Sequence, residues 1–238
     1  MKLSIIIPAL NEAAYLPDTI LKAIENAFSG NTHEFIVVDS GSRDATSRIA
    51  VNLGAKIVNC EDNVPGKAHL LNRGAAFATG DVYLFLDADT ILPPAYDLLI
   101  EKSLSDLASV GGAFEFSLHG SEFGLRVVEL INRVRYRIRQ RYYGDQGIFI
   151  RSEVFKRVGG YPNRGLLESA YLCKILRSQG TLKLLNRVIK TSPRRFITGG
   201  IYRVLASDIK IWFLDLLGLP VEKYAEPYWE ENRLGFKN

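Results

Sequence analysis

Residues 80–89 read Gly-Asp-Val-Tyr-Leu-Phe-Leu-Asp-Ala-Asp, an apolar run that ends in two carboxylates one residue apart. The continuous apolar segment 82–86 is typical of a strand that is buried on both faces. Residues two apart on an extended backbone point the same way, so Asp87 and Asp89 can face one ion while Ala88 turns aside. Such hard oxygen ligands suit Mg²⁺ or Mn²⁺, and Mg²⁺ usually completes its shell with water and substrate phosphates. The stretch therefore predicts a buried strand that leads into a phosphate-linked metal site.

Strand-like and helical segments alternate on both sides of this stretch. The predicted strands of the first half are 3–7, 35–38, 56–58 and 82–86, and the predicted helices between them are 17–28, 44–54 and 66–78. The second half is less regular, with predicted strands at 110–116, 147–151 and 182–188 and predicted helices at 121–143, 167–179 and 201–217. Strand and helix in alternation, with short connections, favour the α/β class, in which helices cover both faces of a mostly parallel sheet.

Length and composition exclude several other classes of protein. The 238 residues are 47% hydrophobic and 24% charged, which suits one compact unit rather than a disordered chain or a coiled coil. Two cysteines and no Asn-x-Ser/Thr sequon argue against a secreted, disulfide-bonded protein. No run approaches the roughly 18 apolar residues of a membrane helix. We therefore expect a cytoplasmic protein, either soluble or bound peripherally at the inner face of a membrane.

Acidic side chains follow three of the predicted strands. Glu12 comes after the first strand, Asp39 after the second, and Asp87 and Asp89 after the fourth. Ligands of an open parallel sheet bind beyond the carboxyl ends of its strands, so these side chains are expected at one rim. Carboxylates gathered there would repel one another without a cation or a hydrogen-bonding ligand. The alternative, in which Asp89 only caps the following turn, is disfavoured by Asp39 on the neighbouring strand end.

Motifs of other enzyme classes are missing from the sequence. It contains no Gly-x-Gly-x-x-Gly, no Gly-x-x-x-x-Gly-Lys-Ser/Thr, no His-Glu-x-x-His and no Gly-x-Ser-x-Gly. Dinucleotide-binding enzymes, P-loop enzymes, zinc proteases and serine hydrolases therefore lack their characteristic residues. A sugar nucleotidyltransferase would also use carboxylates and Mg²⁺, but it needs a loop rich in glycine and arginine after the first strand, and residues 8–12 do not provide one.

The basic residues are concentrated in one segment. Residues 121–143 contain six arginines and two glutamates, an excess equal to the formal net charge of +4 of the whole chain. On a helix, Arg133, Arg137 and Arg141 would share a face. That face is either simply solvated or attracted to an anionic partner, such as a phospholipid surface or a lipid phosphate. Nucleic acid is not expected, because no recognition motif accompanies the arginines.

Several motifs, taken in order, resemble the family 2 glycosyltransferases of the GT-A fold. The first four are residues 4–12, 37–46, 66–72 and 80–89. Residues 144–151, 155–162, Glu168 and 192–195 resemble a small bacterial and cyanobacterial branch of the same family. The resemblance covers nearly the whole chain. It implies a Rossmann-like GT-A domain that transfers a sugar, with inversion, from a nucleotide-diphosphate donor to a hydroxyl acceptor.

We expect a single domain, residues 1–238, whose first half binds a nucleotide by analogy with doubly wound sheets. Residues 1–110 would form the nucleotide-sugar half, 111–195 the acceptor and catalytic half, and 196–238 a C-terminal helical extension. The donor-binding residues that the resemblance implies are Pro8, Ala9, Leu10, Glu12, Asp39, Lys67, Asp87, Ala88 and Asp89. Asp89 would be the principal ligand of Mn²⁺ or Mg²⁺, and Asp87 a ribose contact or a further metal contact.

The catalytic base is where the sequence departs from the family. The family usually has Glu-Asp at the head of the helix that begins near residue 167, whereas this chain has Glu168-Ser169. A serine is not a base at neutral pH without activation of its own. We hypothesise that Glu168 takes this role, with Asp145 as the second choice. Ser169 also leaves open a weak enzyme or a non-catalytic protein that binds a sugar nucleotide or a lipid.

The acceptor is expected to contact segment 121–143 and the terminal helix. Arginines beside the aromatic and aliphatic residues 212–217 would suit a lipid or lipid-phosphate acceptor at a bilayer surface. The alternative is that these apolar residues pack in the core.

Overall fold

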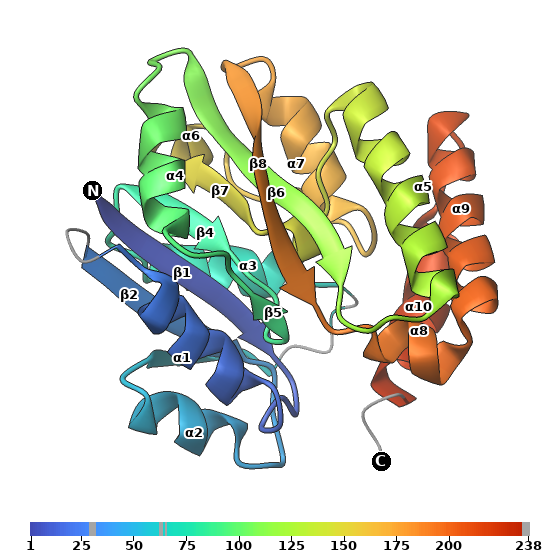
Figure 1. The fold of residues 1–238 in the computed structure, drawn as a ribbon, viewed down its shortest axis with the longest axis horizontal. Coiled ribbons are helices and arrows are strands. Elements are labelled where there is room, and N and C mark those ends of the chain that lie inside the picture. The colour runs from blue at the N-terminus through green and yellow to red at the C-terminus, as the bar shows by residue number, and fades with distance from the viewer. Residues whose placement is uncertain (29–31, 62–63, 65, 235–238) are drawn as a thin grey trace.

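The computed structural model describes residues 1–28, 32–61, 64 and 66–234, and the strands within them form one eight-stranded sheet (Figure 1). The strands are β1 (Lys2–Ala9), β2 (Thr32–Asp39), β3 (Lys56–Asn59), β4 (Val82–Phe85), β5 (Thr90–Ile91), β6 (Ser109–Leu118), β7 (Ile148–Arg151) and β8 (Thr181–Thr191). Their order across the sheet is β3-β2-β1-β4-β7-β6-β8-β5.

Helices connect the strands and complete the C-terminal part of the chain. They are α1 (Leu16–Asn26), α2 (Thr46–Asn52), α3 (Ala68–Ala76), α4 (Tyr96–Leu104), α5 (Phe123–Arg139), α6 (Ser152–Arg157), α7 (Glu168–Leu176), α8 (Arg194–Gly199), α9 (Ile201–Leu216) and α10 (Ala225–Leu234). Short 3₁₀ turns occur at Gly144–Gln146 and Glu222–Tyr224. None of the helices in the described part of the chain is long and apolar enough to cross a membrane.

The sheet is mixed, and its parallel part carries the N-terminal half of the chain. Strands β3, β2, β1 and β4 are all parallel, as the alternation of strands and helices predicts. Strand β7 is antiparallel to both of its neighbours, β4 and β6, whereas β6 and β8 are parallel to each other. The prediction of an α/β fold with a mostly parallel sheet is therefore confirmed, with a short antiparallel strand at its centre.

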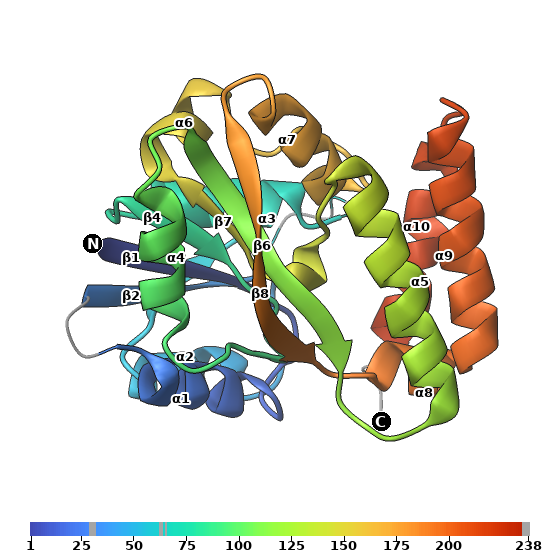
Figure 2. The same ribbon diagram turned by 45° about the horizontal axis from the view of Figure 1, so that its top comes forward.

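Apolar side chains of β1 alternate between two cores. Leu3, Ile5 and Ile7 pack with helices α1, α2 and α4 on one face, while Ile6 packs with α3, α6 and α7 on the other. This alternation follows from the two-residue period of a strand. Both faces of the sheet are covered by helices, which leaves the strand ends as the place where a ligand can reach the backbone (Figure 2).

The predicted helical extension, residues 196–238, contains most of α8 together with α9 and α10, although its residues 235–238 lie outside the described residues. Helices α5 and α9 lie side by side at the edge of the molecule in both views (Figures 1 and 2). A Cβ added to Gly124 would lie 2.9 Å from the Ile201 side chain, and Arg141 Nη1 lies 2.8 Å from Asp215 Oδ2. The N-terminal ends of α5 and α9 contact each other, and so do their C-terminal ends, so the two helices run parallel.

Candidate active site

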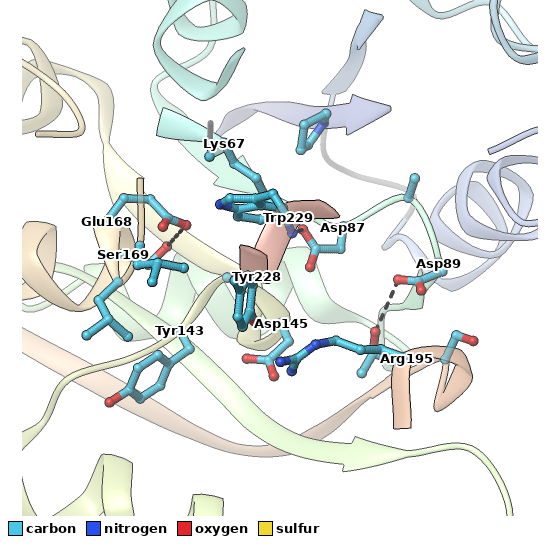
Figure 3. A pocket seen from close by; sticks show the side chains of 18 of the residues that line it. Lys67, Asp87, Asp89, Tyr143, Asp145, Glu168, Ser169, Arg195, Tyr228 and Trp229 are labelled. Atoms are coloured by element: carbon cyan, nitrogen blue, oxygen red, sulfur yellow. Dashed lines mark hydrogen bonds and ion pairs between the residues drawn. The ribbon is translucent and has the colours of Figure 1, made fainter. Parts of the chain in front are cut away.

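A pocket of about 330 Å³ lies beyond the carboxyl ends of β1 and β4, where the strand order predicts a ligand. Its walls combine the turns after these two strands with residues of α3, α5, α7, α8, α9 and α10 (Figure 3). Ten of the residues predicted from sequence line it: Pro8, Ala9, Leu10, Glu12, Lys67, Asp87, Ala88, Asp89, Asp145 and Glu168.

The turn after β1 is held by hydrogen bonds to the turn after β2. Asn11 adopts a left-handed conformation with φ 55°, which asparagine tolerates better than most residues. The Glu12 amide donates to Thr46 Oγ1 at 2.8 Å, so Thr46 positions this turn from the start of α2. The Glu12 carboxylate is buried and accepts from Arg194 Nη1 at 2.8 Å. Burial raises the pKa of Glu12, although Arg194 opposes the shift.

Asp39 lies at the end of β2, as predicted, but its carboxylate accepts hydrogen bonds from the residues that follow this strand. Oδ1 accepts from the Ser42 amide at 2.8 Å, and Oδ2 accepts from the Ser47 hydroxyl. The following residue, Ser40, lines the pocket, whereas Asp39 is not among the residues that do. The predicted contact of Asp39 with the donor therefore stays a prediction, although each oxygen that accepts one loop hydrogen bond can accept a second.

Asp87 and Asp89 follow β4 and face the pocket, as predicted, but residues 88–89 form a turn rather than an extended backbone, and Ala88 also lines the pocket instead of turning aside. Each is already paired with a cation. Lys67 Nζ lies 2.6 Å from Asp87 Oδ1, and Arg194 Nε lies 3.0 Å from Asp89 Oδ2. Burial raises the pKa of Asp89, and the nearby Arg194 charge opposes this shift. For Lys67, the Asp87 carboxylate raises the pKa by more than burial lowers it.

These two carboxylates are a suitable but partial set of metal ligands. Among the described residues, no group of three or more histidine, cysteine, aspartate or glutamate side chains forms a complete metal site. Mg²⁺ is commonly bound by one or two carboxylates together with water and substrate phosphates. The three carboxylates of Glu12, Asp87 and Asp89 are paired with only two cations, Lys67 and Arg194, which leaves negative charge that a divalent ion could balance. The residues present therefore fit a divalent ion that is shared with a phosphate ligand.

The two predicted base residues occupy the wall formed by α7 and by the 3₁₀ turn at 144–146. Leu167 has a left-handed φ of 59°, and the resulting turn directs Glu168 at the head of α7 into the pocket. Glu168 is 7% exposed, and Ser169 Oγ donates to its carboxylate at 3.3 Å. Burial raises the pKa of Glu168, and Lys67 opposes this. Burial also raises the pKa of Asp145, to about 6, against the influence of Arg135.

Further pocket residues were not among the site residues predicted from sequence. They are Arg135, Tyr143, Arg194, Arg195, Tyr228 and Trp229. Trp229 Nε1 donates to the Gly165 carbonyl at 2.7 Å, and the Arg195 guanidinium lies 4.4 Å from the centre of the Tyr228 ring. Arg194 and Arg195 belong to the segment 192–195 that carries part of the family resemblance, which was the available signal. Tyr228 and Trp229 are brought in by α10, and no local pattern marks them.

The arginines of segment 121–143 do not form a uniform basic face. Arg126 pairs with Glu129, Arg133 and Arg137 both pair with Glu115, and Arg141 pairs with Asp215. Arg135 differs from these, because it lines the pocket and stacks on Tyr143 with 3.8 Å between the guanidinium and the ring centre. The predicted common face of Arg133, Arg137 and Arg141 is therefore wrong for Arg141, whose ion pair points toward α9.

Several known proteins are similar to this chain in sequence or in fold. Residues 4–156 match the family model described as glycosyl transferase family 2. The chain is 43% identical over 173 residues to a PGL/p-HBAD biosynthesis glycosyltransferase of Mycobacterium bovis, covering 68% of this chain and 63% of the relative. It is 36% identical over 115 residues to the glucosyl-3-phosphoglycerate synthase of Mycolicibacterium smegmatis, covering 46% of this chain but only 37% of that relative.

Among solved structures, the fold resembles glucosyl-3-phosphoglycerate synthase from Mycobacterium tuberculosis in complex with Mn²⁺ and UDP-glucose. The TM-score is 0.62 at 23% identity, covering 92% of this chain and 80% of the other. This likeness confirms the predicted GT-A fold. The family model spans the strands β1 to β4 and both acidic turns that build the pocket rim. This chain belongs to glycosyl transferase family 2.

Proposed function

We propose that this protein is a metal-dependent, inverting glycosyltransferase that moves a sugar from a nucleotide-diphosphate donor to a hydroxyl acceptor. The observation that carries the proposal is one pocket in which Asp87 and Asp89, each beside a cation, share the space with the buried carboxylate of Glu168. In the view of Figure 3, Asp89 and Glu168 lie on opposite sides of Tyr228 and Trp229. Two acidic centres on different walls suit a reaction that handles a leaving group and an attacking hydroxyl separately.

The donor side of the proposed site is the rim after β1 and β4. Pro8, Ala9 and Leu10 would line the nucleoside pocket, with Glu12 and Asp39 as polar contacts. Asp87 and Asp89 would hold Mn²⁺ or Mg²⁺, which supplies positive charge where the diphosphate leaving group becomes more negative. Lys67 and Arg194 lie within reach of the same phosphates, because both already contact these carboxylates.

Inversion requires one base on the acceptor side, and we assign it to Glu168. A carboxylate takes a proton from the acceptor hydroxyl most effectively when its pKa is closer to neutral than that of a free side chain, and burial shifts the pKa of Glu168 in this direction. Asp145 stays the second choice because burial raises its pKa to about 6 in the same pocket. Ser169 can hold the Glu168 carboxylate in place through its hydrogen bond.

The proposal divides the chain as predicted from the sequence. Residues 1–110 would bind the donor, 111–195 the acceptor, and the extension from 196 would close the pocket with Tyr228 and Trp229. The acceptor would be a hydroxyl compound, including one linked to a lipid. A cytoplasmic location is part of the proposal. The chain matches only 37% and 30% of the length of the first two glucosyl-3-phosphoglycerate synthases, so their acceptor is not transferred to this protein.

Thermal unfolding with a panel of donors tests the proposed function. UDP-glucose, UDP-N-acetylglucosamine and GDP-mannose would each be added with and without Mn²⁺. We expect one donor to stabilise the protein only when Mn²⁺ is present, by ~2.7 kcal/mol at about 100 times its dissociation constant. If a broad set of nucleotide sugars leaves the midpoint unchanged with Mn²⁺, the donor assignment is wrong.

Product analysis then separates catalysis from the alternatives. A glycosyltransferase releases a nucleoside diphosphate from the donor, whereas a sugar nucleotidyltransferase releases pyrophosphate from a nucleoside triphosphate. A non-catalytic binding protein would be stabilised by the donor but would release neither product with any hydroxyl acceptor offered. Ser169 is the specific reason to run this comparison, because it stands where the family usually has an aspartate.

A further inference from the structure

Helices α5 and α9 each expose a stripe of large apolar side chains. The spacing is the same in both, with steps of seven, four and four residues along the chain. The stripes are Phe123, Leu130, Val134 and Ile138 on α5, and Tyr202, Ile209, Phe213 and Leu217 on α9 and at its C-terminal end. Their exposed fractions run from 37% to 78%. Such side chains are usually found singly on the surface of a soluble protein, so a paired arrangement indicates a contact surface.

The two stripes face the same way. Each residue of a helix advances the direction of its side chain by about 100°, so steps of seven, four and four keep a stripe within an arc of about 80°. The helices touch where Gly124 meets Ile201. Phe123 comes one residue before the contact residue Gly124, so the α5 stripe is rotated about 100° from the line of contact in one direction. Tyr202 comes one residue after Ile201, so the α9 stripe is rotated about 100° in the other direction. Because the helices are parallel, this places both stripes on one side of the pair.

The charges of the two helices are segregated by sign. Glu129 and Asp215 are buried, Asp208 is mostly buried, and each is paired with an arginine. Where the structure describes side chains within α5 and α9, the charged residues at exposed positions are all basic: Arg126, Arg133, Arg137, Arg203 and Lys210. The exposed acid Glu122 lies just before the first residue of α5. Arg133 and Arg137 share the single carboxylate of Glu115, which leaves an excess positive charge there.

The basic residues flank the apolar stripes on their outer sides. Arg126, Arg133 and Arg137 lie beside the α5 stripe, about 40° to 80° from Phe123 and away from α9. Arg203 and Lys210 lie beside the α9 stripe, about 80° to 100° from Tyr202 and away from α5. The resulting face has an apolar centre with a cationic rim on each side, although Glu129 neutralises Arg126, so the excess charge beside the α5 stripe comes from Arg133 and Arg137. We name the eight apolar residues and these five cations the α5–α9 face.

We propose that the α5–α9 face binds the surface of a bilayer that contains anionic phospholipids. Interfacial helices bury apolar side chains about 5–10 Å into the boundary between headgroups and acyl chains, while flanking Lys and Arg side chains remain among the anionic headgroups. A second copy of the chain fits this face less well. Self-association would bring cationic rims together, and like charges that face each other across an interface oppose binding.

The opposite sides of the same helices line the pocket. Asn132 and Arg135 of α5, and Asp208 and Ile211 of α9, are pocket residues. A bilayer on the α5–α9 face would therefore lie about one helix diameter, ~10 Å, from the pocket wall. This arrangement suits a lipid-linked acceptor, but the surface itself does not depend on the proposed transfer reaction.

Sedimentation with vesicles tests the proposal without donor or acceptor, so a failure of the transfer reaction cannot affect the result. The wild-type protein would be mixed with phosphatidylcholine vesicles that contain or lack phosphatidylglycerol. We expect binding to the anionic vesicles that weakens when NaCl rises from about 0.05 to about 0.5 M. The double variant Leu130→Ser/Phe213→Ser should bind at least about tenfold more weakly, because burial of each side chain contributes more than a tenfold factor.

A matched control replaces two apolar residues elsewhere, one about as exposed as Leu130 and one more exposed. Val51→Ser/Leu107→Ser changes side chains that are 59% and 91% exposed, in α2 and between α4 and β6, and it should bind like the wild type. Circular dichroism checks that each variant is folded. Arg203→Gln/Lys210→Gln should reduce the preference for anionic vesicles. The proposal is overturned if the wild type binds neither kind of vesicle, or if the two double serine variants bind the anionic vesicles equally. It is also overturned if the wild type is a dimer and Leu130→Ser/Phe213→Ser dissociates it.

Discussion

The Arg194 guanidinium lies 3.0 Å from the Asp89 carboxylate while its terminal nitrogens donate to Glu12, one of them at 2.8 Å. One side chain from α8 thus joins the turn after β1 to the turn after β4, which are far apart in the sequence. The Glu12 and Asp89 carboxylates are 7% and 11% exposed, so water stabilises their negative charges only weakly and Arg194 compensates for the lost solvation.

Arg194→Gln should destabilise the protein without donor by about 3 kcal/mol, because it leaves two largely buried carboxylates without their common counter-ion. The loss of unfolding free energy is largest at a pH at which Glu12 is ionised. It shrinks as pH falls through the raised pKa of Glu12, since a protonated carboxyl needs no counter-ion. Urea unfolding at pH 7.5 and pH 5 measures both effects. Arg157→Gln, in α6 on an exposed surface, should change stability by less than about 0.5 kcal/mol, and an equal loss in both variants would contradict this interpretation.

Asp89→Asn should abolish the Mn²⁺-dependent part of donor stabilisation, because the neutral amide is a much weaker ligand for a hard divalent ion. The measurement is the thermal midpoint with the stabilising donor, with and without Mn²⁺. Asp106→Asn changes an exposed aspartate that pairs with Lys183 at 3.0 Å, and it should keep the full Mn²⁺ effect. Retention of that effect in Asp89→Asn would remove Asp89 from the metal site.

Glu168→Gln should lower kcat by ~10²- to 10⁴-fold and change the donor KM little, because the amide keeps the shape of the side chain but cannot accept a proton. Asp145→Asn should have a smaller effect. Steady-state release of the nucleoside diphosphate measures both. Ser169→Ala, which removes only the 3.3 Å hydrogen bond to Glu168, serves as the matched control and should retain most activity. Near-normal turnover of Glu168→Gln would exclude Glu168 as the base.

Arg135→Gln should raise the pKa of Asp145 above its value of about 6, because the guanidinium is the strongest influence that favours the ionised carboxylate. Carboxyl NMR of labelled protein would follow Asp145 directly, and its titration midpoint should move to higher pH. If Asp145 contributes to turnover, the acidic limb of the rate profile moves the same way, since a base acts only when deprotonated. Arg133→Gln removes the same charge from the same helix outside the pocket and should leave the midpoint in place.

Trp229 should report donor binding through its fluorescence, because it lies in the pocket wall with Lys67 Nζ 6.0 Å from its ring centre. The chain has two tryptophans, and Trp212 does not line the pocket. Titration with donor and Mn²⁺ should therefore change the emission of wild type and Trp212→Phe but not that of Trp229→Phe. A signal that disappears in Trp212→Phe instead would place the donor elsewhere.

The order of elements and the position of the site could be predicted because both depend on local patterns. The apolar runs of β1, β2 and β4 and the acids that follow them mark one rim, since parallel strands end at the same edge of a sheet. The pattern did not predict where a side chain points within a turn. Asp39 illustrates this, because the Ser42 amide and the Ser47 hydroxyl draw its carboxylate into the loop.

Features that depend on contacts between distant segments could not be predicted. Helix α4 is an exception, because its buried residues Tyr96, Ile100 and Leu104 recur every four residues, and this local signal was overlooked. Tyr228 and Trp229 enter the pocket only because Trp229 bonds to Gly165 and Tyr228 stacks against Arg195. The role of segment 121–143 also depended on partners, since its ion pairs reach Glu115 in β6 and Asp215 in α9.

The antiparallel insertion of β7 has a consequence for how this chain folds. Strand β7 pairs with β4 on one edge and with β6 on the other, where Gly112 lies opposite Phe149. Until residues 148–151 have been synthesised and have returned to this position, β4 keeps an open edge, and such an edge can pair with other chains. The sheet is complete only after residues far apart in the sequence have come into contact, and such long-range contacts slow folding. Newly made chains should consequently be most prone to aggregate just before this strand is in place.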